Sequence, residues 1–125
     1  MCQKYKVLVI DDSPFIFKAV TKALEPKGFQ IVDTAPNGKI GIEMVEKYCP
    51  DIVTLDITMP VMDGIETAKV LIKDYPDVKV LMLSAMGDEM LVNEAKEIGI
   101  KYFLSKPFKS EFLLDCVNAL LDGAA

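Results

Sequence analysis

Five polar side chains follow short apolar runs of this sequence, at the points where buried strands would end: Asp11, Asp12, Asp56, Ser84 and Lys106. Three carboxylates that lie close together repel one another unless a cation neutralises them, so the aspartates indicate a divalent metal site. Mg²⁺ suits such hard oxygen ligands, and so does Mn²⁺. Lys106 adds a positive charge that can pair with Asp56 or with the oxygens of a phosphate group.

Each of these side chains also has an ordinary explanation when it is considered alone. Asp56 could cap a turn, Ser84 could satisfy a strand end, and Lys106 could be a surface lysine before a loop proline. The two consecutive aspartates could cap a helix, although the serine that follows them already offers a cap. The functional interpretation therefore depends on the four matching strand ends taken together.

The run before Asp56 is the element that must position it. Ile52 to Leu55 form a short, largely β-branched run that predicts a strand buried on both faces, and Pro60 cannot continue it. Asp56 is therefore expected at the carboxyl end of a strand. In open parallel α/β sheets, ligands bind at that edge because the loops leave the sheet there and helix N-termini point back at it.

Apolar runs alternate with amphipathic segments along the rest of the chain. Strands are expected at residues 7–10, 29–35, 52–55, 78–83 and 100–104. Helices are expected from Pro14 toward Gly28, over residues 39–48, 65–74 and 88–98, and from Ser110, which can cap the last one. This order predicts one doubly wound α/β domain over residues 1–125, with a parallel sheet and helices on both faces.

Apolar stripes predict which side of each helix faces the core. Their members are Ile16, Val20, Ala23 and Leu24; Ile40, Met44, Val45 and Tyr48; Ala68, Leu71 and Ile72; and Phe112, Leu113, Cys116, Val117 and Leu120. Phe15 falls off the first stripe and is expected on the surface.

Composition restricts the classes of partner. The net charge of −5 argues against nucleic acid or an anionic membrane surface, since both need clustered Lys and Arg. No apolar run approaches about 18 residues and no signal-peptide pattern is visible, so a cytoplasmic location is expected. The sequence has no histidine, so any phosphohistidine belongs to another protein. Cys2, Cys49 and Cys116 offer no zinc pattern, and the last two are expected to be reduced packing residues.

Together, these motifs resemble the receiver domain of two-component response regulators, and especially the single-domain chemotaxis and sporulation regulators. The motifs that carry the resemblance are Asp11-Asp12, Leu55-Asp56, Met59-Pro60, Asp63-Gly64, Ser84-Ala85 and Lys106-Pro107. Their order and spacing match over essentially the whole chain. The resemblance implies a flavodoxin-like sheet of strand order 2-1-3-4-5 and a receiver without an effector domain.

The resemblance also implies roles for the residues at the strand ends. Asp56 would be the phosphoacceptor and would take a phosphoryl group from a partner's phosphohistidine. Asp11 and Asp12 would hold Mg²⁺ together with Asp56 and the backbone carbonyl of Thr58. Lys106 and the metal would neutralise the transferring oxygens, so the protein would catalyse its own phosphorylation without being a turnover enzyme.

Ser84 and Phe103 are implied to form the switch. Ser84 would hydrogen-bond a phosphoryl oxygen, and Phe103 would move between exposed and buried positions. Phe103 replaces the commoner Tyr, which places any step that needs the hydroxyl in doubt. Thr58 and Met86 occupy the positions that tune attack by water, and neither orients water, so slow dephosphorylation over minutes to hours is expected. The resemblance further implies a cis peptide bond before Pro107.

Two surfaces are expected to bind partners. Phe15 is expected to dock a histidine-bearing helix of a histidine kinase or a phosphotransfer protein. An output face is expected beside Phe103, on the fourth helix, fifth strand and fifth helix. It would bind a downstream protein or a second copy of this chain, so the chain would be a monomer or a dimer that forms on phosphorylation. The candidates on that face are Met90, Val92, Leu114 and Leu121.

Three other classes of protein fit less of the pattern. An aspartyl-phosphate phosphatase needs a second acid two residues after its nucleophile, where this chain has Thr58. A flavin carrier shares the architecture, but no phosphate loop rich in Ser or Thr follows the first strand, and tryptophan is absent. A degenerate receiver that acts only as a scaffold would not need the intact set of acids, hydroxyl and lysine.

Overall fold

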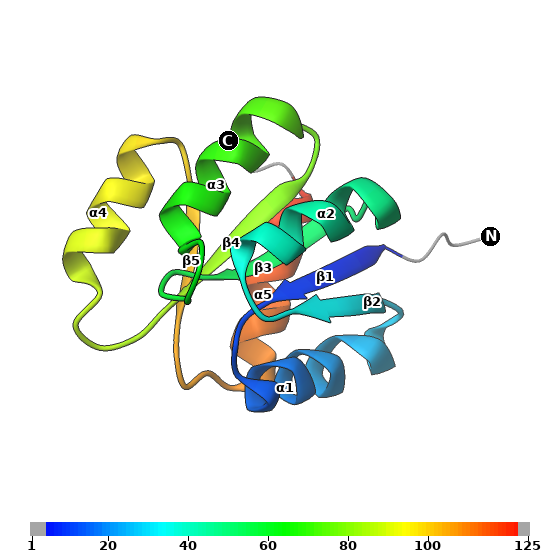
Figure 1. The fold of residues 1–125 in the computed structure, drawn as a ribbon. Coiled ribbons are helices and arrows are strands. Elements are labelled where there is room, and N and C mark those ends of the chain that lie inside the picture. Colours follow the sequence, from blue (N-terminus) through cyan, green and yellow to red (C-terminus); the bar gives the residue numbers. More distant parts are fainter. Residues whose placement is uncertain (1–4, 123–125) are drawn as a thin grey trace.

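Five parallel strands alternate with five α-helices in the computed structural model, which describes residues 5–122 (Figure 1). The strands are β1 (Lys6–Ile10), β2 (Gln30–Ala35), β3 (Ile52–Asp56), β4 (Lys79–Ser84) and β5 (Tyr102–Ser105). The helices are α1 (Pro14–Leu24), α2 (Gly38–Tyr48), α3 (Gly64–Asp74), α4 (Glu89–Glu97) and α5 (Ser110–Leu121), with a 3₁₀ turn, Glu25–Lys27, after α1. The strands lie in the order β2-β1-β3-β4-β5, which confirms the expected fold class.

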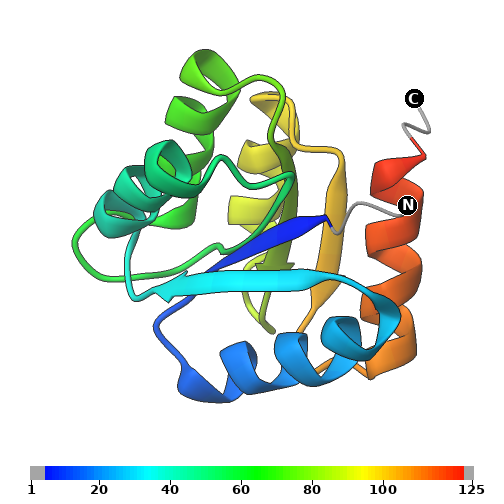
Figure 2. The ribbon, with the colours of Figure 1, turned by 90° about the vertical axis from the view of Figure 1, so that its right-hand side faces the viewer.

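The helices cover both faces of the sheet. Helices α1 and α5 contact each other on one face, while α2, α3 and α4 form a row on the other (Figures 1 and 2). This is the layering that short crossovers between parallel strands require. No helix among residues 5–122 has the length and apolarity needed to cross a bilayer.

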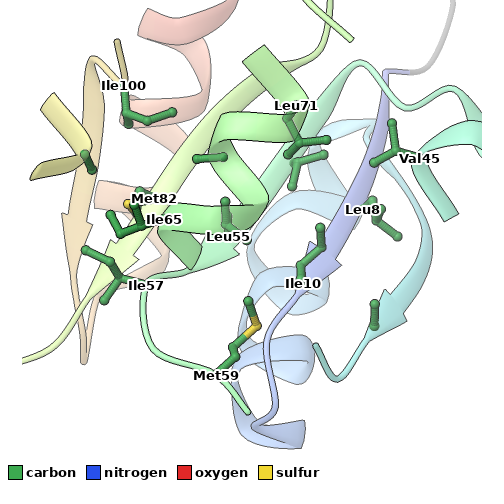
Figure 3. Packing of buried hydrophobic residues seen from close by; sticks show 14 residues of the cluster. Leu8, Ile10, Val45, Leu55, Ile57, Met59, Ile65, Leu71, Met82 and Ile100 are labelled. Carbon is green, nitrogen blue, oxygen red and sulfur yellow. The ribbon is translucent and has the colours of Figure 1, made fainter. Parts of the chain in front are cut away.

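Each face of the sheet has its own apolar core. On the side of α2, α3 and α4, Leu8, Leu55 and Met82 of three neighbouring strands pack near Val45 of α2 and Leu71 of α3 (Figure 3). The second core, under α1 and α5, contains Val7, Val9, Val20, Leu24, Ile52, Leu81, Leu83, Leu113 and Val117. All five residues of β3 are buried, which confirms that the central run lies between two covered faces.

Two glycines allow the loop after β3 to lie close to its neighbours. A Cβ atom at Gly64 would collide with the backbone of Asp56 and Ile57, and one at Gly38 would collide with the Thr67 side chain. The N–H of Gly64 donates to the Ile57 carbonyl at 3.0 Å, and the N–H of Gly38 donates to the Met62 carbonyl at 3.2 Å. The loop is therefore tied to both β3 and α2.

Several expected boundaries are shifted by one or two residues. The largest shift concerns the fifth strand, which was expected from Ile100 and begins at Tyr102. The Ile100 N–H donates to the Ala95 carbonyl at 3.1 Å, and Gly99 adopts a positive φ of 112°. These residues therefore still close the end of α4, and the strand can begin only after them.

Of the two expected serine caps, the one at Ser110 is wrong and the one at Ser13 is confirmed only in part. Lys109 is the N-cap of α5, and Ser110 is already the first residue inside the helix. Ser13 is the N-cap of α1, but its side chain makes no capping hydrogen bond. The side chains that do cap helices are those of Asn37, which accepts from the Ile40 N–H, and Asp63, which accepts from the Glu66 N–H, both at 2.9 Å.

Two residues of the expected inward stripes, Ile72 and Phe112, are exposed. The buried side of α3 contains Ile65, Ala68 and Leu71. Ile72 lies off that side and is 39% exposed. Phe112 is exposed in the first turn of α5, where Leu113 takes the inward position.

Cysteine exposure also differs from the expectation in one case. Cys49 follows α2 in a left-handed conformation with φ of 49° and is exposed, so it is not a packing residue. Cys116 is half-buried against the core under α1 and α5, as expected. Cys2 lies outside the described residues.

Candidate functional site

The carboxyl ends of four neighbouring strands meet at one edge of the sheet. The register pairs Ile10 with Leu55, and Asp56 with Leu83, so the ends of β1, β3 and β4 are level. Beyond the ladder, the Lys106 N–H donates to the Ser84 carbonyl at 2.7 Å, which keeps β5 level with β4. This alignment brings the polar residues that follow the four strands into one site.

Asp11, Asp12 and Asp56 form one cluster at this edge. Each contributes a carboxylate oxygen, and these three oxygens all lie within 4.8 Å of one another. Asp11 and Asp56 are buried, whereas Asp12 is exposed at the mouth of the cluster. It is the only such group of three potential metal ligands among residues 5–122.

Lys106 pairs with both buried aspartates. Its Nζ lies 3.0 Å from Asp11 Oδ2 and 3.1 Å from Asp56 Oδ1. The pair with Asp56 was expected, whereas the pair with Asp11 was not. The Lys106–Pro107 peptide bond is cis, in agreement with the expectation drawn from the resemblance.

Lys106 does not fully compensate the effects that disfavour the ionised form of the Asp56 carboxyl. Burial, with only 5% of the residue exposed, and the neighbouring charge of Asp11 raise its pKa from 3.8 to about 6. The charge and hydrogen bond of Lys106 act in the opposite direction without cancelling that rise. A strongly shifted acid next to a specific charged partner is typical of functional sites.

Lys106 responds to the same charges. Burial alone would lower the pKa of its ammonium, but the hydrogen bond to Asp11 and the negative charges of Asp11 and Asp56 outweigh that effect. The net result is a raised pKa, so the ammonium stays charged at neutral pH.

Backbone N–H groups fix the orientation of the two buried carboxylates. The Ser13 N–H donates to Asp11 Oδ1 at 2.9 Å, and the Thr58 N–H donates to Asp56 Oδ1 at 3.3 Å. In each case the side chain of an aspartate accepts from the backbone two residues later, and this local turn directs the carboxylate toward the common site. Thr58 contacts Asp56 through its N–H, so the metal-ligand role of its carbonyl remains a prediction.

Ser84 and Phe103 border a pocket of about 510 Å³ beside the acidic cluster. Ser84 is buried at the end of β4, and the Lys96 ammonium of α4 lies 5.7 Å from the centroid of the half-buried Phe103 ring. The pocket extends between the loop after β4, the inner side of α4 and Lys106. The pocket therefore lies between the expected switch residue Phe103 and Lys106, which pairs with two aspartates of the acidic cluster.

The residues of the cluster fit a Mg²⁺ ion. Mg²⁺ holds its ligands at about 2.1 Å in an octahedron, so ligand oxygens lie roughly 3 to 4 Å apart. Three carboxylate oxygens within 4.8 Å of one another need only a small adjustment to reach that geometry. Exposure of Asp12 leaves one side of the site open to water or phosphate.

Sequence reasoning missed two contacts that support the site. The Asp88 side chain accepts the Ala85 N–H at 2.7 Å and so closes the loop after Ser84. An acid at the expected start of a helix was a usable signal for that bond. The contact between Lys96 and Phe103 joins a helix to the next strand and has no local sequence pattern.

The expected partner surfaces are present only in part. Phe15 is 77% exposed, as expected. Of the four apolar residues expected on the output face, Met90 is exposed. Val92, Leu114 and Leu121 are instead partly buried against the two cores, so the expected apolar face is smaller than the stripes predicted.

Comparisons with known proteins agree with this geometry. Residues 7–118 match the model of the response regulator receiver domain. The chemotaxis protein CheY of Bacillus subtilis is 36% identical over 118 residues, which cover 94% of this chain and 98% of that protein. CheY of Listeria monocytogenes is 40% identical, with coverage of 90% and 95%.

Solved structures show the same similarity. CheY in a CheX-CheY-BeF3-Mg²⁺ complex from Borrelia burgdorferi superposes with a TM-score of 0.86 at 37% identity, covering 94% of this chain and 89% of that chain. CheY4 of Vibrio cholerae superposes with a TM-score of 0.84 at 31% identity, with coverage of 94% and 99%.

Proposed function

This chain belongs to the response regulator receiver family of two-component signalling proteins, and from that premise we propose that it is a phosphorylation-activated switch with Asp56 as the phosphoacceptor. The observation that carries the proposal is the convergence of three carboxylates and Lys106 on one small site, with Asp56 the residue at the end of the fully buried central strand. The phosphoryl donor is a phosphohistidine of a histidine kinase or a phosphotransfer protein, because this chain has no histidine of its own.

The chemical step needs no general base. With a pKa of about 6, most of the Asp56 carboxyl is ionised at pH 7, and one of its oxygens attacks the phosphorus directly. The bond between phosphorus and the imidazole nitrogen breaks as the new oxygen–phosphorus bond forms. The electron pair of the broken bond returns to the imidazole, and the product is an acyl phosphate on Asp56.

Asp11, Asp12 and Asp56 would hold Mg²⁺, with the Thr58 carbonyl as a fourth protein ligand, and Mn²⁺ would serve in its place. The ion supplies positive charge that offsets the repulsion between carboxylates and transferring phosphoryl oxygens. Asp12 is suited to the outer side of the site because its carboxylate is already exposed.

Lys106 changes partners during transfer. Its Nζ, now shared by Asp11 and Asp56, turns toward a phosphoryl oxygen once the acceptor is occupied. The Ser84 hydroxyl donates to another phosphoryl oxygen and draws the loop after β4 inward. Phe103 then moves within the pocket beside α4, which alters the surface of α4, β5 and α5.

The remaining assignments follow from this role. Residues 1–125 act as one receiver domain, and the output of this domain is protein contact. It works in the cytoplasm, and its partners are the donor protein, which Phe15 helps to dock, and a downstream protein on the face formed by α4, β5 and α5. It is a monomer or a dimer that forms on phosphorylation.

The test is the intact mass of the protein after incubation with acetyl phosphate and Mg²⁺. The unmodified chain is expected to gain the mass of one phosphoryl group, and the gain is expected to disappear in Asp56→Ala and in excess chelator. If no mass is gained, BeF₃⁻ is added as a mimic of the phosphoryl group. A chain that responds to BeF₃⁻ has a working site but does not accept acetyl phosphate as a donor. A chain that also shows no amide shift changes with BeF₃⁻ is not a working switch.

A further inference from the structure

Lys96 lies on the last turn of α4, with its ammonium close to the ring of Phe103. The distance from Lys96 Nζ to the ring centroid is 5.7 Å. An ammonium within about 6 Å of an aromatic ring centroid is attracted by the negative charge that the π-electrons place on the face of the ring. The contact is therefore a weak electrostatic bond between α4 and β5.

No carboxylate competes with the ring for this ammonium in the described part of the chain. Within residues 5–122, the salt bridges are the two that Lys106 makes. The residues one turn before Lys96 on α4 are Val92 and Asn93, which carry no charge. The Phe103 ring is thus the partner that the structure provides for the Lys96 charge.

The Phe103 ring needs such a contact to have a defined position. A phenyl ring carries no hydroxyl, so no hydrogen bond of the side chain can fix it. The ring is half-buried against the core under α2, α3 and α4, and it also borders the pocket of about 510 Å³. Apolar burial is non-directional, so it does not by itself decide where the ring rests at the edge of an open pocket.

The position of Lys96 along α4 gives the contact a direction. Helix α4 begins at the acceptor edge of the sheet with Glu89, and Lys96 lies about 10 Å farther along the helix axis. Phe103 likewise lies about 10 Å before Lys106 along the chain of β5. Both partners are therefore set back from the acceptor edge, whereas Ser84 and Lys106 lie at it. The pocket extends from the contact to these two edge residues.

We propose that Lys96 is a positioning residue that holds Phe103 in its resting place, so that the switch must break a cation–π contact. This inference rests on the proposed function. Movement of the ring into the pocket toward Ser84 takes it away from the Lys96 ammonium. Because the contact is already close to the limit of about 6 Å, a shift of about one or two ångströms ends it. The contact therefore favours the resting state and lowers the active population about two- to fivefold.

The test measures how much BeF₃⁻ the chain needs to reach its active state with Mg²⁺ present. BeF₃⁻ binds the active state, so its apparent affinity rises in proportion to the population of that state. A titration followed by backbone amide shifts gives the concentration at half of the change. Lys96→Gln removes the charge, and this midpoint should fall about threefold. Loss of a positive charge by itself weakens binding of an anion, so the change in net charge acts in the opposite direction.

Three further variants make the comparison specific. Lys96→Arg keeps a cation that can stack on the ring and should retain the midpoint of the unmodified chain. Lys101→Gln removes the same charge at an exposed position just before β5 and should not lower the midpoint. Phe103→Leu has no aromatic face, so adding Lys96→Gln to it should change the midpoint by less than about 1.5-fold. If Phe103→Leu does not fold, the comparison of Lys96→Gln with Lys96→Arg decides alone.

Other results overturn the inference. An equal or higher midpoint in Lys96→Gln would show that the contact does not favour the resting state. An equal fall in Lys96→Gln and Lys96→Arg, or the same fall in the Phe103→Leu background, would assign the effect to α4 and not to the ring. In each of these cases the proposed function stands. If neither BeF₃⁻ nor acetyl phosphate acts on the unmodified chain with Mg²⁺ present, the proposed function fails, and this inference fails with it.

Discussion

Lys106 Nζ lies 3.1 Å from Asp56 Oδ1, so the loop after β5 brings a cation directly to the end of the central strand. The pair does not neutralise the site, because Asp11 shares the same ammonium and the pKa of Asp56 remains near 6. An excess of buried negative charge is therefore built into the resting protein. That excess favours binding of a divalent cation and gives the acceptor its reactivity toward a phosphoryl group.

Replacing Lys106 tests its part in the transfer. Lys106→Met removes the only cation seen at Asp56 in the described residues, so labelling by acetyl phosphate with Mg²⁺ should slow about 100-fold. The rate is measured as the gain of intact mass with time. Lys101→Met alters an exposed lysine at the opposite end of β5 and should keep the normal rate. A normal rate in Lys106→Met would contradict the assigned role.

Metal-free stability should depend on the charge of Asp56. The pKa of Asp56 is about 6 in the folded chain, above the ordinary value of 3.8, so between about pH 4 and about pH 6 the folded state binds more protons than the unfolded state. The free energy of unfolding therefore falls as the pH rises through this window. The raised pKa of Lys106 contributes stability throughout that range and loses it only in alkaline solution.

Asp56→Asn removes this dependence on pH. In chelator at pH 7 the variant should be about 1–3 kcal/mol more stable than the unmodified chain, with a smaller difference near pH 4. Urea unfolding at both pH values measures it. Asp77→Asn, an exposed position, should leave the pH dependence unchanged. A lower stability of Asp56→Asn at pH 7 would show that the ionised Asp56 carboxylate does not destabilise the metal-free folded state.

Mg²⁺ should stabilise the folded chain through the acidic cluster. A ligand present at about 100 times its Kd adds roughly 2.7 kcal/mol, so the thermal midpoint should rise by several degrees. Asp12→Asn should reduce that rise sharply without unfolding the protein, because Asp12 is exposed. Asp77→Asn again provides the matched control. An equal Mg²⁺ effect in Asp12→Asn would exclude Asp12 as a ligand.

Gly64 should be needed for the shape of the acceptor loop. Gly64→Ala introduces a Cβ atom that collides with the backbone of Asp56 and Ile57, so we expect a loss of about 2 kcal/mol or more in unfolding free energy. Gly28 has a positive φ of 93° but open space around it, so Gly28→Ala should cost only about 1 kcal/mol. Equal losses in the two variants would show that the backbone of Asp56 and Ile57 can move to accommodate a Cβ atom at position 64.

The phosphorylated chain should lose its phosphoryl group slowly. Thr58 cannot orient water as an acid or amide would, and Met86 is 97% exposed and apolar. We therefore expect a half-life of minutes to hours once the donor has been removed, measured by the decay of the phosphorylated mass. A half-life of seconds in the isolated protein would contradict this expectation.

The sequence predicted the parts of this molecule that depend on local pattern. The buried run Ile52–Leu55 placed Asp56 correctly, since an apolar strand ending before a proline has few alternatives. The five polar residues after strands were also brought together, because parallel strands of similar length end at one edge. Their roles in metal binding and transfer remain proposals.

Features that depend on tertiary contact were missed or misjudged. The buried side of α3 is formed by Ile65, Ala68 and Leu71, and this leaves Ile72 exposed despite its apolar character. The second partner of Lys106, Asp11, depends on how the loops after β1 and β5 meet. No local sequence pattern predicts the positive φ of 69° at Val61, which lies in a loop tied by hydrogen bonds of Met62 and Gly64.

The most direct test of the account identifies which carboxylate carries the phosphoryl group. The chain is labelled with acetyl phosphate and Mg²⁺, the acyl phosphate is reduced with borohydride to homoserine, and the peptides are sequenced by mass spectrometry. Homoserine is expected at position 56 alone, and none in a sample treated with chelator. Homoserine at position 11 or 12, or labelling that persists in Asp56→Ala, would contradict the assignment of Asp56 as the phosphoacceptor.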